Sequence, residues 1–365
     1  MSDLYIGLMS GTSLDGADGV LVDFSSAKIR VIASATQTFS NNFRAELMAL
    51  NSPSHNELQR AALAANQLAE VYAKVVNSLL HDASLAAKDI QAIGAHGQTV
   101  RHQPALGYTT QLNNPALLAE RTGIDVVADF RSRDVAAGGQ GAPLVPAFHQ
   151  SVFGKQNATT LVLNIGGISN ISVLPATGDI LGFDCGPGNA LMDAWALEHT
   201  CQHFDEGGQW AASGQMIPAL LASLLDEPYF AMQPPKSTGR DLFSVAWLAE
   251  KLTPFVTQRP VDVQNTLTEF TAKACIAGAS SYLNNSKDLI VCGGGAFNHY
   301  LMQRLQAGLP SLQVASSSAH GLPPLQVEAA AFAWLARQTV LRLPGNLPSV
   351  TGATGLRVLG AIYPA

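Results

Sequence analysis

The chain has 365 residues, 47% of them apolar and 13% charged, and a net charge of −6 at neutral pH. This composition excludes a disordered chain, and an acidic balance without a basic stripe argues against nucleic acid as a partner. No apolar run reaches the roughly 18 residues that a membrane-spanning helix needs. The length suits two domains, and four cysteines without C-x-x-C pairing favour reduced thiols in a cytoplasmic protein.

The first predicted element is a β-hairpin over residues 4–24, LYIGLMSGTSLDGADGVLVDF. Two apolar runs flank a turn rich in Gly, Ser, Thr and Asp. Glycines let a ligand approach the backbone closely, and consecutive amides form a concave nest that suits phosphate oxygens. Asp15 and Asp18 would repel a bare phosphate, so they fit either a nearby divalent cation or turn-forming bonds to their own backbone. This stretch alone is equally compatible with a surface turn.

Strands and helices then alternate as in an α/β protein. Residues 28–39 predict a strand, and residues 56–81 predict an amphipathic helix with apolar residues every three or four positions. Strands at 90–95 and 125–130 run into polar clusters that contain the candidate binding residues His96, Gln98, Arg131 and Asp134. Open α/β sheets place their ligands at such strand ends. An exposed ion pair is the alternative interpretation of Arg131 and Asp134.

The second half begins as the first does, because apolar strands flank the turn Gly166-Gly167. Its predicted elements are strands at 160–165, 168–174, 180–183 and 288–292, and helices near 191–197, from about 298, and at 327–341. The third strand ends at Asp184, which could be a catalytic carboxylate or the N-cap of the next helix. The fourth enters Gly293-Gly294-Gly295. Two halves that each open on a glycine hairpin predict duplicated α/β domains with a cleft between them.

Neither G-x-x-x-x-G-K-[ST] nor G-x-G-x-x-G occurs, which argues against P-loop and dinucleotide-binding folds. Two phosphate hairpins and a strand–GGG–helix turn instead resemble the superfamily of acetate and sugar kinases, actin and heat-shock chaperone ATPases. A closer resemblance runs along the whole chain, in the stretches MSGTSLDGAD (9–18), GAHGQTVRH (94–102), VADFRSRDVAAGGQGAPLVP (127–146), NIGGISNI (164–171), GFDCGPGNALMDAW (182–195), PPKSTGRDLF (234–243), CGGGAFN (292–298), EAAAFAWLA and PGNLPSVTGA (328–353). These stretches are similar to those of the anhydro-N-acetylmuramic acid kinases.

The resemblance implies two duplicated actin-like (ribonuclease H-like) domains with a nucleotide and substrate cleft between them. We expect residues 1–130, joined by the tail 342–365, to form the first domain and residues 131–341 to form the second. The implied reaction uses ATP, Mg²⁺ and water to open the 1,6-anhydro ring of 1,6-anhydro-N-acetylmuramic acid and phosphorylate O6, in recycling of the cell wall. The resemblance also implies a cytoplasmic homodimer whose partners are the amino sugar and ATP.

The site residues follow from the same resemblance. The expected ATP-binding residues are Gly11, Thr12, Ser13, Leu14, Asp15, Gly16, Ala17, Asp18, Gly166, Gly167, Gly293, Gly294 and Gly295. Asp15 or Asp18 would reach Mg²⁺, directly or through water. The expected sugar-binding residues are His96, Gln98, Arg131, Asp134 and Glu328, with Arg131 on the lactyl carboxylate. Glu328 could equally be a favourable charge at the start of a helix.

Asp184 is the expected general base for the water that attacks C1. The sequence departs from the family pattern beside it, because Cys185 stands where threonine is expected, and Leu325–Gln326 replace an acidic residue before Glu328. The residues do not indicate a role for Lys236. Two alternatives stay open: a kinase of another anhydro-sugar such as 1,6-anhydroglucose, and an actin- or chaperone-like ATPase that drives conformational change.

Overall fold

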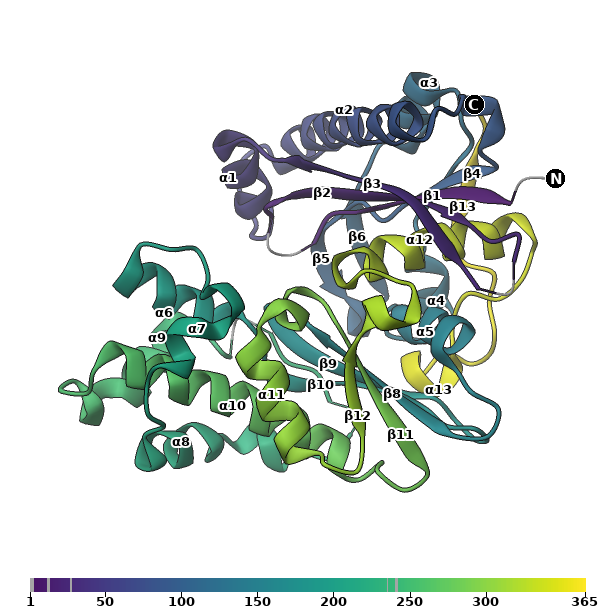
Figure 1. Ribbon diagram of the computed structural model, residues 1–365. Coiled ribbons are helices and arrows are strands. Elements are labelled where there is room, and N and C mark those ends of the chain that lie inside the picture. The colour runs from purple at the N-terminus through teal and green to yellow at the C-terminus, as the bar shows by residue number, and fades with distance from the viewer. Residues whose placement is uncertain (1–2, 12–13, 27, 235, 240–241) are drawn as a thin grey trace. The chain divides into compact units, whose positions relative to one another are not determined.

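The computed structural model describes residues 3–11, 14–26, 28–234, 236–239 and 242–365. The chain forms two compact units, which we call unit 1 (Met1–Val152 with Gln326–Ala365) and unit 2 (Phe153–Leu325). Each unit contains one main β-sheet and the helices that pack on it (Figure 1). None of the helices among the described residues has both the length and the apolar character needed to cross a membrane.

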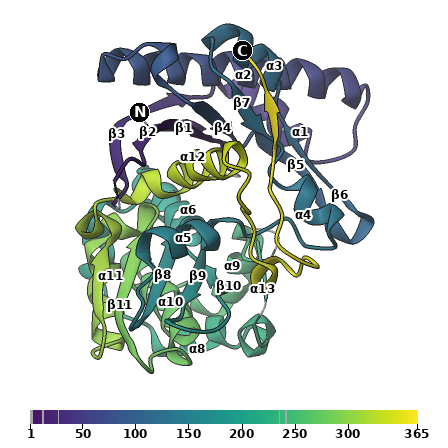
Figure 2. The same ribbon diagram turned by 90° about the vertical axis from the view of Figure 1, so that its right-hand side faces the viewer.

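Unit 1 is built on a six-stranded sheet in the order β13-β7-β4-β1-β2-β3. Its strands are β1 (Leu4–Met9), β2 (Gly16–Asp23), β3 (Arg30–Thr38), β4 (Ala92–Ala95), β7 (Val126–Ala128) and β13 (Ala361–Tyr363), beside a separate ribbon of β5 (Gln98–Gln103) and β6 (Tyr108–Leu112). Its helices are α1 (Asn41–Ala49), α2 (Glu57–Ala83), α3 (Pro115–Thr122), α4 (Ser132–Ala136), α5 (Val145–Phe153, which runs into unit 2), α12 (Val327–Val340) and α13 (Pro348–Thr351). Figures 1 and 2 show α2 on one face of the sheet and α12 on the other.

Unit 2 is built on the five-stranded sheet β10-β9-β8-β11-β12. Taken from β12 to β10, its order corresponds to the order from β7 to β3 in unit 1. Its strands are β8 (Thr159–Ile165), β9 (Ile168–Leu174), β10 (Leu181–Pro187), β11 (Ser286–Cys292) and β12 (Gln313–Ser316). Its helices are α6 (Ala190–Thr200), α7 (Gln209–Ala212), α8 (Pro218–Leu225), α9 (Val245–Leu252), α10 (Pro260–Ser280) and α11 (His299–Gly308). The apolar core lies between the sheet and helices such as α8, α10 and α11.

The two sheets share their pairing directions as well as their order. In each, the first strand pairs antiparallel with the second and parallel with the fourth, and the second pairs antiparallel with the third. The last strand of the pattern then adds in parallel, as β7 beside β4 and β12 beside β11. The predicted duplicated α/β fold is therefore confirmed.

The boundaries of the units differ from the predicted ones. Residues 131–152 and 326–341, which we expected in the second domain, belong to unit 1. Helix α12 packs against β1 and β4, where glycines bring its backbone close to the sheet. The alanine-rich sequence of α12 does not indicate which sheet the helix packs against. Its place in unit 1 could therefore not be predicted.

Gly94 on β4 is required for the close approach of α12. A Cβ atom at Gly94 would lie 2.0 Å from the carbonyl oxygen of Phe332, and one at Gly7 would lie 1.9 Å from that of Ala329. Gly94→Ala is therefore expected to lower the free energy of unfolding by about 2–3 kcal/mol, a typical cost of overpacking.

Chemical denaturation measures this loss, and Gly107→Ala is the matched control. Gly107 has φ +79° and nothing within 4 Å of an added Cβ, so its substitution costs only the left-handed backbone, about 1 kcal/mol. Equal losses in the two variants would contradict the role of close packing at Gly94.

Candidate active site

In the hairpin of unit 1, buried groups anchor the described residues on either side of Thr12 and Ser13. The amide of Leu14 donates to the carbonyl of Gly11 at 3.2 Å, and Leu14 is buried with φ 58°. The hydroxyl of Ser10, just before the turn, donates to the side-chain oxygen of Gln98. Thr12 and Ser13, two of the predicted ATP-binding residues, lie outside the described residues.

Two other predicted ATP-binding residues of this hairpin serve packing. A Cβ atom at Gly16 would lie 2.6 Å from the carbonyl oxygen of Gln37, so Gly16 allows β2 to pair closely with β3. The methyl group of Ala17 is fully buried. Close packing therefore explains why both positions hold a small residue.

The two carboxylates of the hairpin are placed differently. Asp15 is exposed and lies 3.4 Å from the guanidinium of Arg44. Asp18 accepts a 2.7 Å hydrogen bond from the Thr36 hydroxyl. Although Asp18 keeps contact with solvent, the protein around its carboxyl raises its pKa, the Thr36 bond lowers that pKa and the charge of Asp15 raises it.

Three of the predicted sugar-binding residues form one cluster in unit 1, which we call the Arg131 cluster: His96, Arg131 and Glu328. Arg131 donates through Nε and Nη2 to Nε2 of His96, at 3.2 and 3.0 Å. Because arginine can only donate, His96 accepts at Nε2 and is neutral. Burial, followed by the charge of Arg131, lowers the pKa of His96 to about 3.

Electrostatics connect Glu328 to this cluster. Burial lowers the pKa of Arg131 to about 10, against the raising effects of Glu328 and Asp134. The protein around Glu328 raises the pKa of its carboxyl although the residue touches solvent, while Arg131 lowers that pKa and Asp18 raises it. The Arg131 cluster thus combines a cation that can bind an anionic group with a neutral imidazole and a carboxylate that can accept hydrogen bonds.

Gln98 and Asp134, the other two predicted sugar-binding residues of this unit, are buried and have partners within the fold. Gln98 is 1% exposed and its oxygen accepts from Ser10. Asp134 is 0% exposed, which also rules out the alternative of an exposed ion pair with Arg131. Both residues were predicted to bind the sugar because they follow predicted strands. That position does not distinguish a residue that contacts a ligand from one that contacts the rest of the protein.

The carboxylate of Asp134 fixes the loop after α4 to the C-terminal segment. It accepts from the Gly141 amide at 2.8 Å, the Asn346 amide group at 2.7 Å and the Thr351 hydroxyl at 2.8 Å. The carbonyl of the same Gly141 accepts a 2.8 Å bond from Nη1 of Arg131. Asp134 therefore acts on the Arg131 cluster through the position of Gly141.

The hairpin of unit 2 is held from one side by the turn after β10. The carbonyl of Gly166 accepts from the Asn189 amide at 2.7 Å, and that of Gly167 accepts from the Gly188 amide at 2.9 Å. In a trans peptide the N–H points opposite to the C=O. The amide of Gly167 is therefore directed away from this turn, as a phosphate-binding amide requires.

The predicted adenosine turn lies against this hairpin. A Cβ atom at Gly293 would be 2.6 Å from the carbonyl oxygen of Ile165, and one at Gly295 would be 2.4 Å from the side chain of Ile165. Gly294, between them, is exposed and opens the 3₁₀ turn η6 (Gly294–Phe297). The structure thus brings the Gly166-Gly167 hairpin and the 293–295 turn together within unit 2.

Asp184 lies on β10 next to an irregularity in the pairing with β9. The register shifts between Asp184 and Gly186, so the strand is bulged at Cys185. Bulges of this kind re-aim side chains and occur beside active sites. The N-cap of α6 is Asn189, so the alternative that Asp184 caps this helix is wrong.

A loop that the sequence left without a role holds Asp184 in place. The Thr238 amide donates to the Asp184 carboxylate at 2.9 Å, and the Asp184 amide donates to the Lys236 carbonyl at 3.0 Å. The Tyr229 hydroxyl donates to the Asp184 carbonyl at 2.7 Å. Lys236 in turn donates to the Tyr229 carbonyl at 3.1 Å, and its ammonium lies 4.5 Å from the Tyr229 ring centroid.

Among the described residues, these contacts give the Asp184 carboxylate one hydrogen bond, in a partly desolvated position. Burial raises the pKa of Asp184, and the hydrogen bond from the Thr238 amide lowers it. A carboxyl with a raised pKa is a stronger base when ionised, which suits general-base catalysis. Sequence reasoning missed Tyr229 and Thr238, although Thr238 belongs to the stretch PPKSTGR.

The unusual Cys185 does not disturb Asp184. Its side chain is buried against α10, where a Cβ atom at Gly278 would lie 2.7 Å from the Cys185 sulfur. A hydrogen bond with Cys275 and burial raise the pKa of the Cys185 thiol, which stays protonated. Cys185 packs into the core while the Asp184 side chain is only half-buried, so a cysteine is accommodated there.

Two sheets of the same strand order, each with a glycine hairpin between its first two strands, define a protein of the duplicated actin-like α/β fold. The chain belongs to the anhydro-N-acetylmuramic acid kinase family, whose sequence model matches residues 3–365. The resemblance read from the sequence is therefore confirmed, and the chain is a kinase.

Relatives of that name are similar over their full length. The protein from Variovorax paradoxus is 64% identical, with 100% of this chain and 99% of the relative covered. The protein from Albidiferax ferrireducens is 63% identical, with both chains fully covered. The one from Cupriavidus pinatubonensis is 58% identical, with 99% and 98% covered. A glucokinase from Streptomyces griseus, solved with glucose and AMPPNP, aligns at a TM-score of 0.43 and 15% identity over 92% of this chain and 99% of its own.

Proposed function

We propose that this kinase uses ATP and water to convert 1,6-anhydro-N-acetylmuramic acid into N-acetylmuramic acid 6-phosphate, in recycling of the cell wall. Membership of the family over residues 3–365 supports this substrate. The observation that carries the chemistry is Asp184, a half-buried carboxylate with a raised pKa that is held by the Thr238 amide.

Asp184 acts as the general base in this proposal. It takes a proton from water as the water oxygen bonds to C1, and the bond between C1 and O6 of the anhydro bridge breaks. The released O6 then bonds to the γ-phosphorus of ATP, and ADP leaves. Phosphoryl transfer asks the protein mainly for positioning and for neutralisation of charge.

The remaining site residues supply that positioning. We assign the ATP phosphates to the hairpin turns at Gly11–Asp18 and Gly166-Gly167, and the adenosine to Gly293–Gly295. The Arg131 cluster holds the sugar, with the Arg131 guanidinium on the lactyl carboxylate and Glu328 accepting from hydroxyl groups. Its neutral His96 keeps the cluster from accumulating a second positive charge.

The donor set of the first hairpin fits a magnesium ion that arrives with ATP. Asp15 and Asp18 lie close enough for the charge of Asp15 to raise the pKa of Asp18, and a cation would relieve this repulsion. Mg²⁺ is commonly held by one or two carboxylates together with substrate phosphates. When bound, it would neutralise charge on the transferred phosphoryl group. Asp18 or Asp15 would hold it, directly or through water.

We also propose that the chain works as a homodimer in the cytoplasm. Four cysteines present as thiols support a reducing compartment: Cys185, Cys201, Cys275 and Cys292. Two-fold dimers are the commonest oligomers. Sedimentation of the purified chain tests the dimer, and a monomer at micromolar concentration would exclude it.

Mass spectrometry of products formed in ¹⁸O-labelled water tests the proposed reaction. We expect one ¹⁸O atom at C1 and a phosphate at O6 of the same molecule. Phosphorylation without label at C1 would exclude the coupled hydrolysis. Faster phosphorylation of 1,6-anhydroglucose would exclude the substrate, and ATP turnover that no sugar changes would favour the conformational ATPase.

A further inference from the structure

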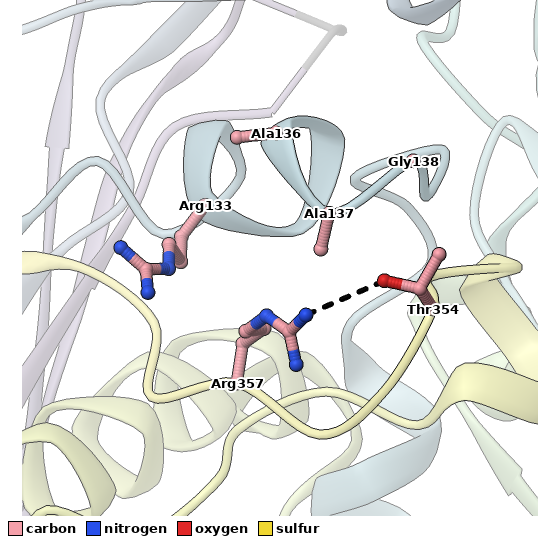
Figure 3. A pocket seen from close by; sticks show the side chains of 6 residues that line it. All are labelled: Arg133, Ala136, Ala137, Gly138, Thr354 and Arg357. Carbon is pink, nitrogen blue, oxygen red and sulfur yellow. Dashed lines mark hydrogen bonds between the residues drawn. The ribbon is translucent and has the colours of Figure 1, made fainter.

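A pocket of about 500 Å³ lies in unit 1 between the end of α4 and the C-terminal tail (residues 342–365). It is lined by Arg133, Ala136, Ala137, Gly138, Thr354 and Arg357. Figure 3 shows Arg133 extending from α4 and Arg357 from the tail, where Arg357 points toward Thr354. The two arginines are far apart in the sequence, so the fold itself brings their charges to one pocket.

Neither guanidinium has a carboxylate partner. Most described arginines form ion pairs, as Arg60 does with Glu46 and Arg337 with Asp3, and Arg131 faces Glu328 and Asp134. Within the described part of the chain, no carboxylate lies at ion-pair distance from Arg133 or Arg357. Two uncompensated cations at one pocket are notable in a chain whose net charge is −6.

The pocket walls are formed without a ligand. The Thr354 amide donates to the Ala137 carbonyl at 2.8 Å, and the Gln140 amide donates to the Thr351 carbonyl at 2.7 Å. Arg357 donates to the Leu356 carbonyl at 2.9 Å and to the Thr354 hydroxyl at 3.3 Å. Since that hydroxyl accepts from Arg357, its own proton is left to donate to a ligand.

This pocket is separate from the Arg131 cluster. Arg131 turns inward to His96 and the Gly141 carbonyl, whereas Arg133, two residues later, is exposed. None of the residues that line the pocket belongs to the Arg131 cluster or to the hairpin turn. A ligand here would therefore not occupy the proposed sugar site.

We propose that Arg133, Arg357 and the Thr354 hydroxyl bind a phosphate dianion, either free or as the monoester of a small sugar. The charge of a dianion matches that of the two guanidinium groups, and the planar forks of arginine match phosphate oxygens. Ala136 and Ala137 add an apolar wall that the carbon skeleton of a monoester would contact. The volume of the pocket accommodates an anion of either size.

Calorimetric titration of the full chain with sodium phosphate, and in a second arm with glucose 6-phosphate, tests this site. We expect wild-type protein to bind with a Kd on the order of 1 mM, and the affinity to fall as potassium chloride is added. Arg133→Gln and Arg357→Gln should each weaken binding about tenfold, as loss of a charge-assisted bond does. Tighter binding of glucose 6-phosphate would identify a monoester, and tighter binding of phosphate the free ion.

Arg342→Gln is the matched control, because Arg342 is exposed, belongs to the same unit and lies outside the pocket. It should change the affinity by less than about twofold. Arg133 makes no hydrogen bond that its substitution would break among the described residues, so Arg133→Gln reports on binding rather than folding. No binding by wild-type protein, or binding that survives both pocket substitutions, would overturn the proposal.

Discussion

Asp184→Asn is expected to lower the turnover number about 10³-fold, because a general base contributes roughly 10²–10⁴-fold to a rate. An amide cannot take the proton from the attacking water. It can still accept the hydrogen bond from the Thr238 amide, so the loop around it should keep its place. Steady-state phosphorylation of the anhydro sugar measures the loss, and binding of an ATP analogue should stay close to that of wild type.

The stability of the same variant separates lost chemistry from lost structure. Burial raises the pKa of Asp184 in the folded chain, so the folded state binds its proton more readily than the unfolded state does. Stability therefore falls as pH rises through the window above the unfolded pKa, and the ionised carboxylate is a cost at neutral pH. Asp184→Asn should unfold at the same temperature as wild type or higher.

The pH dependence of the rate provides a second readout. Below its raised pKa Asp184 is protonated and cannot act as a base, so turnover by wild type should decline as the pH is lowered. The residual turnover of Asp184→Asn should not decline as the pH is lowered. Asp179→Asn, at an exposed carboxylate of the same unit, should retain full turnover. Comparable loss at both positions, or retained turnover in Asp184→Asn, would remove Asp184 from the mechanism.

Local patterns in the sequence located the elements but not the contacts between distant segments. Strands 160–165 and 168–174 were predicted within a residue of β8 and β9, because apolar runs and a two-glycine turn are local signals. Asp184 was found because it follows the predicted strand 180–183, although β10 itself continues past it to Pro187. Tyr229 and Thr238 hold it from 45 and 54 residues further along, where no periodicity relates them to β10.

The partners of Asp134 within the fold could not be predicted from the sequence. The prediction that it contacts the sugar rested on its place at a strand end, beside Arg131. Its partners Asn346 and Thr351 are 212 and 217 residues away and come from the stretch PGNLPSVTGA, which was recognised without being given a role. Helix α12 was predicted in the wrong unit for the same reason, because its partners are far away in the sequence. Neither its helical pattern nor a motif indicates which sheet it packs against.

Asp134→Ala is expected to lower the free energy of unfolding by about 4 kcal/mol, within the range found when one partner of a buried charged network is removed. The substitution removes the acceptor of three hydrogen bonds, which come from the Gly141 amide, the Asn346 amide group and the Thr351 hydroxyl. Chemical denaturation measures the loss. Asp82→Ala, at an exposed carboxylate on α2, should stay within about 0.5 kcal/mol of wild type.

Asp134→Asn isolates the effect on the sugar site. Its oxygen can replace one acceptor of Asp134, but its NH₂ group must then face a donor, so the Gly141 peptide loses its fixed position for a cost of about 2 kcal/mol. The carbonyl of Gly141 holds Arg131, so the guanidinium is released from one of its partners. We expect KM for the anhydro sugar to rise about tenfold and KM for ATP to stay unchanged, since one hydrogen bond to a charged group corresponds to that factor. A folded Asp134→Asn enzyme with an unchanged KM for the sugar would show that Asp134 stabilises unit 1 without positioning Arg131.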